Sequence, residues 1–332
     1  MTERNLKVVL GSRPEGKPTV DNFRVEEGPL PVAAEGQVLV RNQWLSIDPY
    51  MRGRMMDIRT YAEPVALGDV MVGDTAGVVV ASRHPDFAPG DPVAAYLGWQ
   101  RFGVAEGGAL RRVDPRIPLS VSLGAAGMPG VTAWVGLLDL CQPKAGETVV
   151  VSAASGGVGS VAGQLARIAG CRVVGIAGGA DKCRHVTEAL GFDACLDYRA
   201  EDFRQQLKAA VPKGIDCIFD NVGGPVLEAL IGRINPFARV TLCGAISEVD
   251  NPSPTGLRRL LPLIVNRVKL QGFIVGDHLE RWPVAIADLS GHVAAGRIRY
   301  HETLAEGLEA APQALLDLLA GRSLGKQLVR IP

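Results

Sequence analysis

The stretch Thr148–Ser160, TVVVSAASGGVGS, decides the fold class of this chain. Its β-branched residues predict a buried strand, which leads directly into a glycine-rich turn. The small and apolar residues that follow, VAGQLARIAG, predict a helix. A strand, a glycine-rich turn and a helix in this order are the context that a dinucleotide-binding loop requires.

Each glycine of this loop has a physical role in such a site. Gly156 and Gly157 would let the backbone approach a pyrophosphate, and Gly159 would let the helix pack closely on the strand. The helix N-terminus would present N–H groups and a positive dipole end to the phosphates. Ala154 stands where the first glycine of G-x-G-x-x-G is usual, so a tight turn without a phosphate is the alternative. The further strand–helix units that follow favour cofactor binding.

From Pro143 onward, apolar strands alternate with helical segments, which predicts an α/β doubly wound parallel sheet, a Rossmann domain. The expected strands are Thr148–Ala153, Arg172–Ile176, Ala194–Asp197, Cys217–Asp220, Arg239–Cys243 and Leu270–Val275. Helices are expected to begin near Val158, Asp181, Glu201, Pro225 and Thr255, with another near Arg281–Ala295.

The first 120 or so residues have a different texture, with short alternating runs such as Gln37–Asn42, Gly77–Ala81 and Asp91–Tyr96. They predict a mostly-β domain of short strands and turns. The tail predicts a helix at Ala311–Ala320 and a strand at Lys326–Ile331 that returns to this domain. We therefore expect a β domain over 1–125, completed by 300–332, and a dinucleotide domain over 126–299.

Composition narrows the class of protein. Of 332 residues, 35 are Lys or Arg and 35 are Asp or Glu, so no net field favours nucleic acid or anionic lipid. The cluster of Arg258, Arg259, Arg267 and Lys269 is interpreted as a solvated face. The apolar stretches are too short to cross a bilayer, and Met1–Leu10 lacks the apolar core of a signal peptide. We expect a soluble, cytoplasmic protein.

The cysteines and histidines argue against zinc. The first 140 residues contain no cysteine and only one histidine, His84, so no ligand set for catalytic zinc is available there. No CxxC pair exists, and we expect no metal. Most cysteines lie in apolar runs and are interpreted as small core residues; the six are Cys141, Cys171, Cys183, Cys195, Cys217 and Cys243.

The end of the second expected strand bears on the choice of cofactor. An NAD site usually has an acidic residue there to hold the ribose hydroxyls, but this strand ends in Ala177–Gly178–Gly179. Lys182 and Arg184 follow closely and would suit a ribose 2′-phosphate. The alternative is that Lys182 is only a solvated residue in the first turn of a helix. We favour NADPH.

Several segments resemble the zinc-independent medium-chain dehydrogenase/reductases, in the branch of prostaglandin, alkenal double-bond and curcumin reductases. They are Trp44–Arg52 (WLSIDPYMR), Met128–Leu138 (MPGVTAWVGLL), Ala153–Ser160, Asp220–Gly224 (DNVGG), Cys243–Ser247 (CGAIS), Gln271–Val275 (QGFIV) and Gly325–Val329 (GKQLV). The resemblance covers nearly the whole chain. It implies a GroES-like β domain beside the Rossmann domain, and a homodimer joined at the sheet edge formed by Leu270–Val275.

The resemblance also implies a set of cofactor-binding residues. The pyrophosphate would be held by Gly157, Val158, Gly159 and Ser160, and the 2′-phosphate side by Gly178, Lys182 and Tyr198. The nicotinamide side would be formed by Met128, Thr132, Asn221, Cys243, Gly244, Ala245, Ile246, Ser247, Phe273, Ile274, Val275 and Ser323. For Asn221 the alternative is a simple turn, for Tyr198 a packing residue, and for Phe273 and Val275 ordinary core.

By the same resemblance, the expected activity is hydride transfer from NADPH to the activated double bond of an α,β-unsaturated aldehyde or ketone. Tyr50 is the candidate donor of a hydrogen bond to the carbonyl oxygen, although a tyrosine beside Pro49 is also a common wall residue. The branch usually has a tyrosine after C-G-x-I-S, but here Glu248, Val249 and Asp250 follow. An asparagine usual in the tail is replaced by Ser323.

Two other functions stay open at this stage. A quinone reductase would use the same cofactor site and differ only in its acceptor. A protein that binds NADPH without significant turnover is the other alternative, favoured by the missing tyrosine near Val249.

Overall fold

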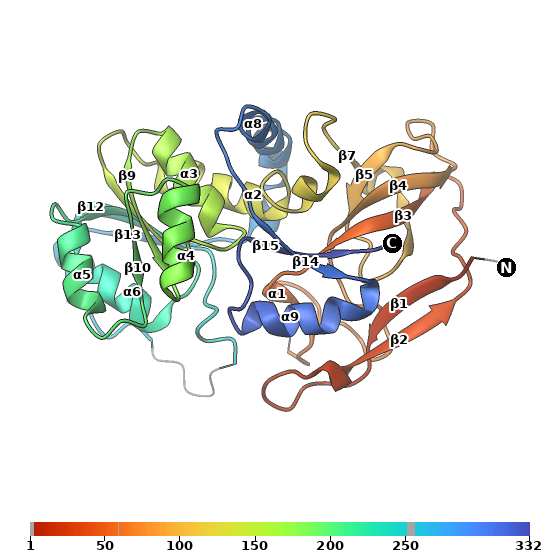
Figure 1. Cartoon of the computed structure of the whole chain (residues 1–332), viewed down its shortest axis with the longest axis horizontal. Coiled ribbons are helices and arrows are strands. Elements are labelled where there is room, and N and C mark those ends of the chain that lie inside the picture. The colour runs from red at the N-terminus through yellow and green to blue at the C-terminus, as the bar shows by residue number, and fades with distance from the viewer. Residues whose placement is uncertain (1–2, 59, 251–255) are drawn as a thin grey trace. The chain divides into compact units, whose positions relative to one another are not determined.

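The computed structural model describes residues 3–58, 60–250 and 256–332. The chain divides into two compact units (Figure 1). The first unit comprises Met1–Gly124 and Glu302–Pro332, and the second comprises Ala125–His301. Within the described ranges, no helix is long and apolar enough to cross a membrane.

The second unit is built on a six-stranded parallel sheet, which confirms the predicted doubly wound α/β class. Its strands are β8 (Thr148–Ser152), β9 (Arg172–Ala177), β10 (Ala194–Asp197), β11 (Ile215–Asp220), β12 (Ile234–Leu242) and β13 (Lys269–Gly272). They lie in the order β10-β9-β8-β11-β12-β13. The chain order therefore reverses between β8 and β11, the point at which ligands bind in sheets of this kind.

Helices pack on this sheet because alternate strand residues point to opposite faces. Val150, Val174 and Ile218 share one cluster with side chains of α5 (Phe203–Ala210) and α6 (Gly224–Ile231). Phe219 points to the other face, toward Gly136 in the helical run Met128–Cys141, of which α2 is Met128–Trp134. Further α-helices described in this unit are α3 (Gly159–Ile168), α4 (Ala180–Arg184), α7 (Leu261–Val265) and α8 (Trp282–Ala294).

The prediction for the last strand of this sheet was wrong in its end point. The expected strand Leu270–Val275 stops at Gly272, so Phe273, Ile274 and Val275 follow the strand. Among the described strands its partner is β12, whose last paired residue is Leu242, opposite Gly272. Beyond that pair the described residues continue no ladder, and a helical turn begins at Val275. The helix start expected near Thr255 lies outside the described residues.

The first unit contains a mainly antiparallel sheet in the order β14-β15-β3-β4-β5-β7, with β6 also paired to β3. The strands are β3 (Gln37–Ser46), β4 (Thr75–Ser82), β5 (Pro92–Ala95), β6 (Phe102–Glu106), β7 (Arg111–Arg112), β14 (Glu302–Glu306) and β15 (Lys326–Arg330). A separate pair consists of β1 (Asn5–Leu10) and β2 (Phe23–Gly28). This confirms the mostly-β class of the first domain.

The C-terminal segment is an integral part of the first unit's core. β15 pairs with β3, with Leu328 opposite Ser46, and α9 (Ala311–Leu319) packs beside β15 (Figure 1). The short helix α1 (Tyr50–Arg54) follows β3 after a turn at 47–49 and buries Met51. The family-like segment Trp44–Arg52 therefore ends in one helical turn.

Candidate active site

The cofactor-binding residues expected from the sequence stand mostly where strands of the second unit end. The phosphate loop follows β8, Gly178 follows β9, Tyr198 follows β10 and Asn221 follows β11. Cys243 follows β12 and Phe273 follows β13. Because all six strands are parallel, these positions lie at the same end of the sheet. This carboxyl end of the sheet is the candidate cofactor site.

The glycine-rich loop owes its shape to two close backbone contacts. The N–H of Gly156 donates to the carbonyl of Ala153 at 2.9 Å, which closes the turn. A Cβ added to Gly159 would lie 2.3 Å from the same carbonyl oxygen, so no larger residue fits without movement. Ala153 itself adopts a left-handed φ of 48°, a conformation that favours glycine.

Ala154 also has a packing reason to be small. Its side chain is fully buried, and its N–H donates to the carbonyl of Ile176 in β9 at 3.0 Å. A Cβ on Gly175 would come within 2.8 Å of the Ala154 Cβ. The replacement of the usual first glycine by alanine is thus accommodated between β8 and β9.

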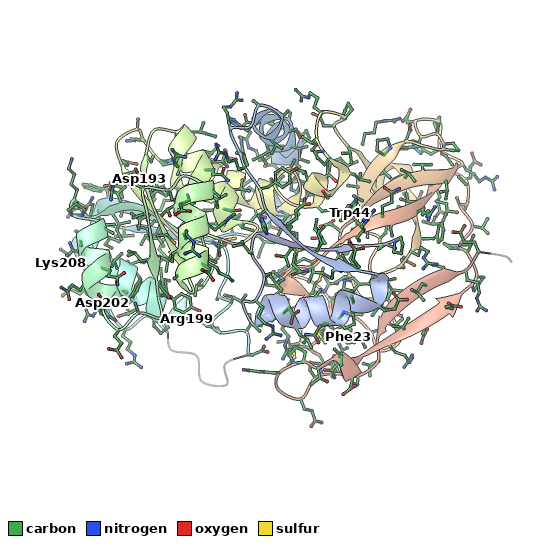
Figure 2. All side chains as sticks on the ribbon, viewed as in Figure 1. Phe23, Trp44, Asp193, Arg199, Asp202 and Lys208 are labelled. Atoms are coloured by element: carbon green, nitrogen blue, oxygen red, sulfur yellow. The ribbon has the colours of Figure 1, made fainter. Side chains whose placement is uncertain are left out.

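A group of cations gathers at the ends of β9 and β10. A Cβ on Gly178 would contact the Tyr198 ring at 2.9 Å and the Arg199 guanidinium carbon at 3.2 Å. Arg199 lies over the Tyr198 ring at 5.5 Å, and Figure 2 labels it at this end of the sheet. Burial and the nearby charge of Arg199 lower the pKa of Lys182. Two cations therefore concentrate positive charge beside an aromatic ring.

Arg199 was not among the residues expected from the sequence. It directly follows Tyr198, and its N–H donates to the Asp197 carboxylate at 3.0 Å. Its position in the sequence, directly after Tyr198 and the third strand, could have identified it as a second cation at this site. Arg184 is less suited to this site because it pairs with Asp181 on α4.

The segments Asp220–Gly224 and Cys243–Ser247 lie against each other. The N–H groups of Cys243, Ile246 and Ser247 donate to the carbonyls of Asp220, Asn221 and Val222, at 2.7, 3.3 and 3.1 Å. A Cβ on Gly224 would lie 2.8 Å from the Ser247 Oγ. The structure thus brings together two stretches that the sequence analysis placed at one site.

The polar side chains in this region are partly committed to the fold. The Asn221 amide donates to the Ser152 carbonyl at 2.7 Å, and the Ser152 hydroxyl donates to Asp220 at 2.6 Å. Burial and the charge of Asp220 raise the pKa of Cys243 to about 12, so this thiol stays protonated at neutral pH. A thiolate nucleophile is therefore not available here.

Met128, Thr132 and Phe273 belong to the same unit. The Thr132 hydroxyl donates to the Met128 carbonyl at 2.8 Å, one turn back along α2. The Phe273 ring packs against Gly136, at which a Cβ would come within 2.8 Å. Their roles toward a cofactor stay predictions.

Tyr50 and Ser323 belong to the first unit. The Tyr50 hydroxyl is buried and has no hydrogen-bond partner within the described residues. Burial, followed by the charges of Asp48 and Asp74, raises its pKa well above the usual value. Tyr96 also affects it, although the two hydroxyls fall short of hydrogen-bond geometry. Ser323 is buried and lines a small cavity with Thr303 and Gln327.

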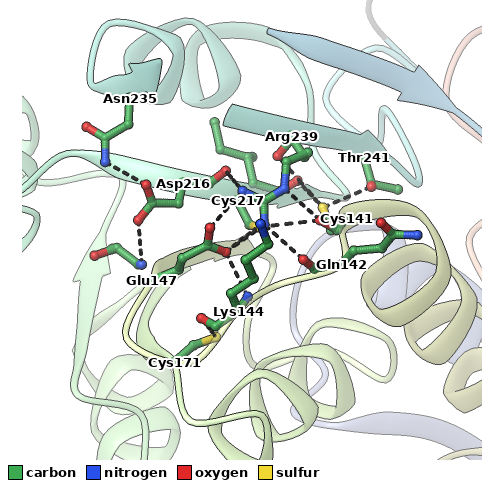
Figure 3. A network of polar contacts seen from close by, with 12 residues as sticks. Cys141, Gln142, Lys144, Glu147, Cys171, Asp216, Cys217, Asn235, Arg239 and Thr241 are labelled. Carbon is green, nitrogen blue, oxygen red and sulfur yellow. Dashed lines mark hydrogen bonds and ion pairs between the residues drawn. The ribbon is translucent and has the colours of Figure 1, made fainter. Parts of the chain in front are cut away.

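Toward the opposite, amino end of the second unit's sheet, polar groups are closely matched (Figure 3). Arg239 of β12 pairs with Glu147 at 2.6 Å and donates to the carbonyl of Cys141 at 2.8 Å. Asp216 accepts from the Thr148 N–H and from Asn235, both at 2.8 Å. Cys141 and Cys217 are fully buried beside this network as free thiols.

No cluster of His, Cys, Asp or Glu that could hold a metal ion occurs among residues 3–58, 60–250 and 256–332. The candidate cofactor site consists of backbone glycines, cations and an aromatic ring at the carboxyl end of a Rossmann sheet.

Comparison with known proteins agrees with this class. A family model described as the N-terminal domain of oxidoreductase matches residues 7–113, and another, described as zinc-binding dehydrogenase, matches residues 157–291. The NADPH-dependent curcumin reductase of Escherichia coli is 48% identical, over 99% of this chain and 97% of its own. The NADP(+)-dependent 2-alkenal reductase of Nicotiana tabacum is 38% identical, over 98% and 97%.

Among solved structures, CurA from Vibrio vulnificus in complex with NADPH superimposes with a TM-score of 0.93 at 44% identity, covering 98% of this chain and 99% of that one. The fold and the site define a two-domain, nucleotide-binding oxidoreductase class. This chain belongs to the zinc-independent branch of the medium-chain dehydrogenase/reductase superfamily, as the sequence motifs predicted.

Proposed function

We propose that this chain is an NADPH-dependent reductase of the activated carbon–carbon double bond in α,β-unsaturated aldehydes and ketones. The observation that carries the proposal is the carboxyl end of the second unit's sheet, where Lys182 and Arg199 lie together and no acid ends β9. The similarity to an NADPH-dependent curcumin reductase and to a 2-alkenal reductase supports it.

The residues present fit this cofactor. The contact between Gly159 and the Ala153 carbonyl lets α3 begin close to the end of β8, as a dinucleotide loop requires. The loop leads directly into α3, whose N-terminus would present a positive dipole end to the phosphates. Lys182, Tyr198 and Arg199 would hold the 2′-phosphate and adenosine. When bound, NADPH supplies the hydride.

Tyr50 would act on the acceptor. As hydride adds to the β carbon, negative charge builds on the carbonyl oxygen, and a hydrogen bond from the Tyr50 hydroxyl would stabilise it. A proton from solvent or from Tyr50 would then reach the α carbon and complete the reduction. Removal of such a donor typically costs roughly 3–4 kcal/mol of transition-state stabilisation. The buried Tyr50 hydroxyl, without a partner in the described part of the chain, is suited to such an acceptor.

NADPH oxidation should be followed against a medium-chain 2-alkenal, an aromatic enone, a simple quinone and no acceptor, with NADH in parallel. We expect oxidation with the enones and a much slower reaction with NADH. Oxidation by the quinone alone would identify a quinone reductase. Tight NADPH binding without oxidation would identify a non-catalytic binding protein. Tyr50→Phe should lower kcat by about 100-fold if its hydroxyl is the donor.

We further propose that the protein is a homodimer joined through the edge of the second unit's sheet. β13 is the last strand of that sheet, and the nearby helix α7 exposes Leu261 (69%) and Ile264 (71%). Exposed apolar groups beside an open strand edge favour a partner surface. Ile264→Asp should halve the molar mass measured by light scattering, whereas Ile168→Asp, on α3, should not.

A cytoplasmic location is also proposed. The described cysteines are all free thiols, including the partly exposed Cys183 and Cys195. Free thiols persist in reducing compartments. Fluorescence microscopy of a tagged full chain in its native host would test the location.

A further inference from the structure

The first unit contains a buried ion pair two residues from Tyr50. The Lys326 Nζ lies 2.9 Å from the Asp48 carboxylate, and the two side chains are only 7% and 8% exposed. Nζ also donates to the Ile47 carbonyl at 2.5 Å, and the Ser46 hydroxyl donates to the other Asp48 oxygen. The C-terminal strand thus holds the turn that precedes α1.

A second carboxyl group, Asp74, is packed against the same turn. The Asp74 carbonyl accepts from the Ser46 N–H at 2.9 Å. A Cβ on the preceding Gly73 would lie 3.0 Å from the Met51 methyl and 3.3 Å from the Ser46 carbonyl. The Asp48 N–H in turn faces the Met51 sulfur at 3.4 Å. The segment that carries Asp48 and Tyr50 therefore packs directly against the segment that carries Asp74.

The charges in this volume act on one another. Burial and the charge of Asp48 raise the pKa of Asp74 to about 7, against the opposing effects of Arg111 and Lys326. Asp48 and Asp74, after burial, are in turn the largest influences that raise the pKa of Tyr50. The charge on Asp74 therefore changes near neutral pH, close to Tyr50.

Other ionisable groups face this cluster without replacing Asp74. Burial raises the pKa of Tyr96, which Tyr50, Arg54 and the charge of Asp74 also influence. Glu302 lies opposite Lys326 in the β14–β15 ladder. Burial raises the pKa of Glu302, against the opposing effects of Ser120 and of the Lys326 charge. Asp74 is the carboxyl group whose pKa responds both to Arg111 and to Lys326.

We propose that Lys326, Asp48 and Asp74 are positioning residues for Tyr50, and that the charge on Asp74 sets how strongly the Tyr50 hydroxyl donates a hydrogen bond. A phenol beside a negative charge is a weaker donor, because donation moves negative charge onto its oxygen. Protonated Asp74 adds no such charge. The donor is therefore stronger below pH 7 and weaker above it. The consequence for reduction rests on the proposed function.

The first test needs neither cofactor nor acceptor. The chain has five tyrosines, so carbon-13 labelling of the tyrosine ring carbon that bears the hydroxyl gives five signals, and Tyr50→Phe assigns one of them. We expect the Tyr50 signal to shift with an inflection near pH 7, the pKa of Asp74. Asp74→Asn should abolish the inflection, and Asp69→Asn, an exposed control in the same unit, should retain it.

The second test concerns the rate. With wild-type protein, kcat for an enone should fall about three- to tenfold as pH rises through 7, and Asp74→Asn should flatten this step. Lys326→Met should lower kcat with little change in the KM for NADPH, and Lys326→Arg should restore it. Where Lys326→Met does not fold, Asp74→Asn carries the test, because it removes a charge and leaves the ion pair intact.

An inflection that persists in Asp74→Asn, or no inflection at the Tyr50 signal in the wild type, would overturn the proposal. So would a pH step in kcat that is unchanged in Asp74→Asn. If no enone supported NADPH oxidation, the proposed function would be refuted. The NMR titration would still decide whether Asp74 acts on Tyr50.

Discussion

The two ends of the second unit's sheet are built on opposite plans. Toward the amino end, Glu147, Arg239 and Asp216 find charged, amide and carbonyl partners within the protein. At the carboxyl end, the chain instead offers glycines and the adjacent cations Lys182 and Arg199. The amino end is joined by an ion pair and hydrogen bonds within the protein, whereas the carboxyl end brings glycines and two adjacent cations together. We therefore expect mutations at the two ends to separate stability from binding.

The largest effect is expected where the two demands meet, at Gly159. Gly159→Val places a side chain where even a Cβ would lie 2.3 Å from the Ala153 carbonyl. The helix must move away from the strand, so NADPH binding should be lost, and overpacking typically costs about 1–3 kcal/mol of stability. Calorimetric NADPH titration and thermal unfolding would measure both. Gly291→Ala, on α8 with open space around it, should leave NADPH binding unchanged and should raise stability slightly, because alanine favours a helix.

At the amino end, Arg239→Met should affect stability alone. Its partner Glu147 would be left about 20% exposed without its ion pair, and we expect a loss of about 2–3 kcal/mol in the free energy of unfolding. The KM for NADPH should not change. Arg259→Met, which breaks a longer 3.8 Å pair with Glu228, should cost less. A large rise in KM for Arg239→Met would contradict the division between the two ends.

The same ion pair predicts an acid dependence. Burial works to raise the pKa of Glu147, but the bonds from Arg239 and the Lys144 N–H outweigh it and lower the pKa. Its contribution to stability is therefore present above the unfolded pKa of about 4.3 and is lost as pH falls below it. Between pH 6 and pH 3, denaturant unfolding should lose less stability in Glu147→Gln than in the wild type.

At the carboxyl end, Lys182→Ala and Arg199→Ala should affect binding alone. Each should weaken NADPH binding about tenfold, as for one lost hydrogen bond to a charged group, and leave NADH binding almost unchanged. Titration of 2′,5′-ADP against AMP isolates the phosphate contribution. Lys208→Ala, an exposed control on α5 (Figure 2), should change neither. Equal losses for both nucleotides would remove the 2′-phosphate role.

The smallest effect is expected at Ala153, where strain and function can be separated. Its left-handed φ of 48° disfavours a residue with a Cβ, so Ala153→Gly should stabilise the protein by about 1 kcal/mol. Chemical denaturation would measure it, with Ala162→Gly inside α3 as the opposite case, expected to destabilise by a similar amount. A loss of stability in Ala153→Gly would show that the Ala153 methyl contributes packing that outweighs the strain.

Local patterns predicted the second unit well because its signals are local. β10 matches its predicted range, and β8 and β9 differ by one residue at an end. β13 was predicted three residues too long because its end depends on β12, which sequence periodicity does not report. β14 (Glu302–Glu306) was missed because its polar ends and short length resemble a loop, and it is a strand only beside β15.

The candidate site followed the same rule. The glycine loop and Lys182 are adjacent in the sequence to the strands that position them, so their place could be predicted. Arg199 was missed because its relation to Gly178 requires β9 and β10 to pair. The surroundings of Tyr50 could not be predicted at all, since Lys326 reaches Asp48 across 278 positions of sequence.

That long-range contact has a consequence for synthesis on the ribosome. Residues 125–301 form the second unit from one continuous stretch, so it has all its strands as soon as that stretch has emerged. The first unit begins earlier but lacks β14, β15 and the partner of Asp48 until residues 302–332 are made. While the second unit is synthesised, β3 lacks its partner strand β15 and the Asp48 carboxylate lacks its ion-pair partner Lys326. The part of the chain that is made first is therefore the part that finishes folding last.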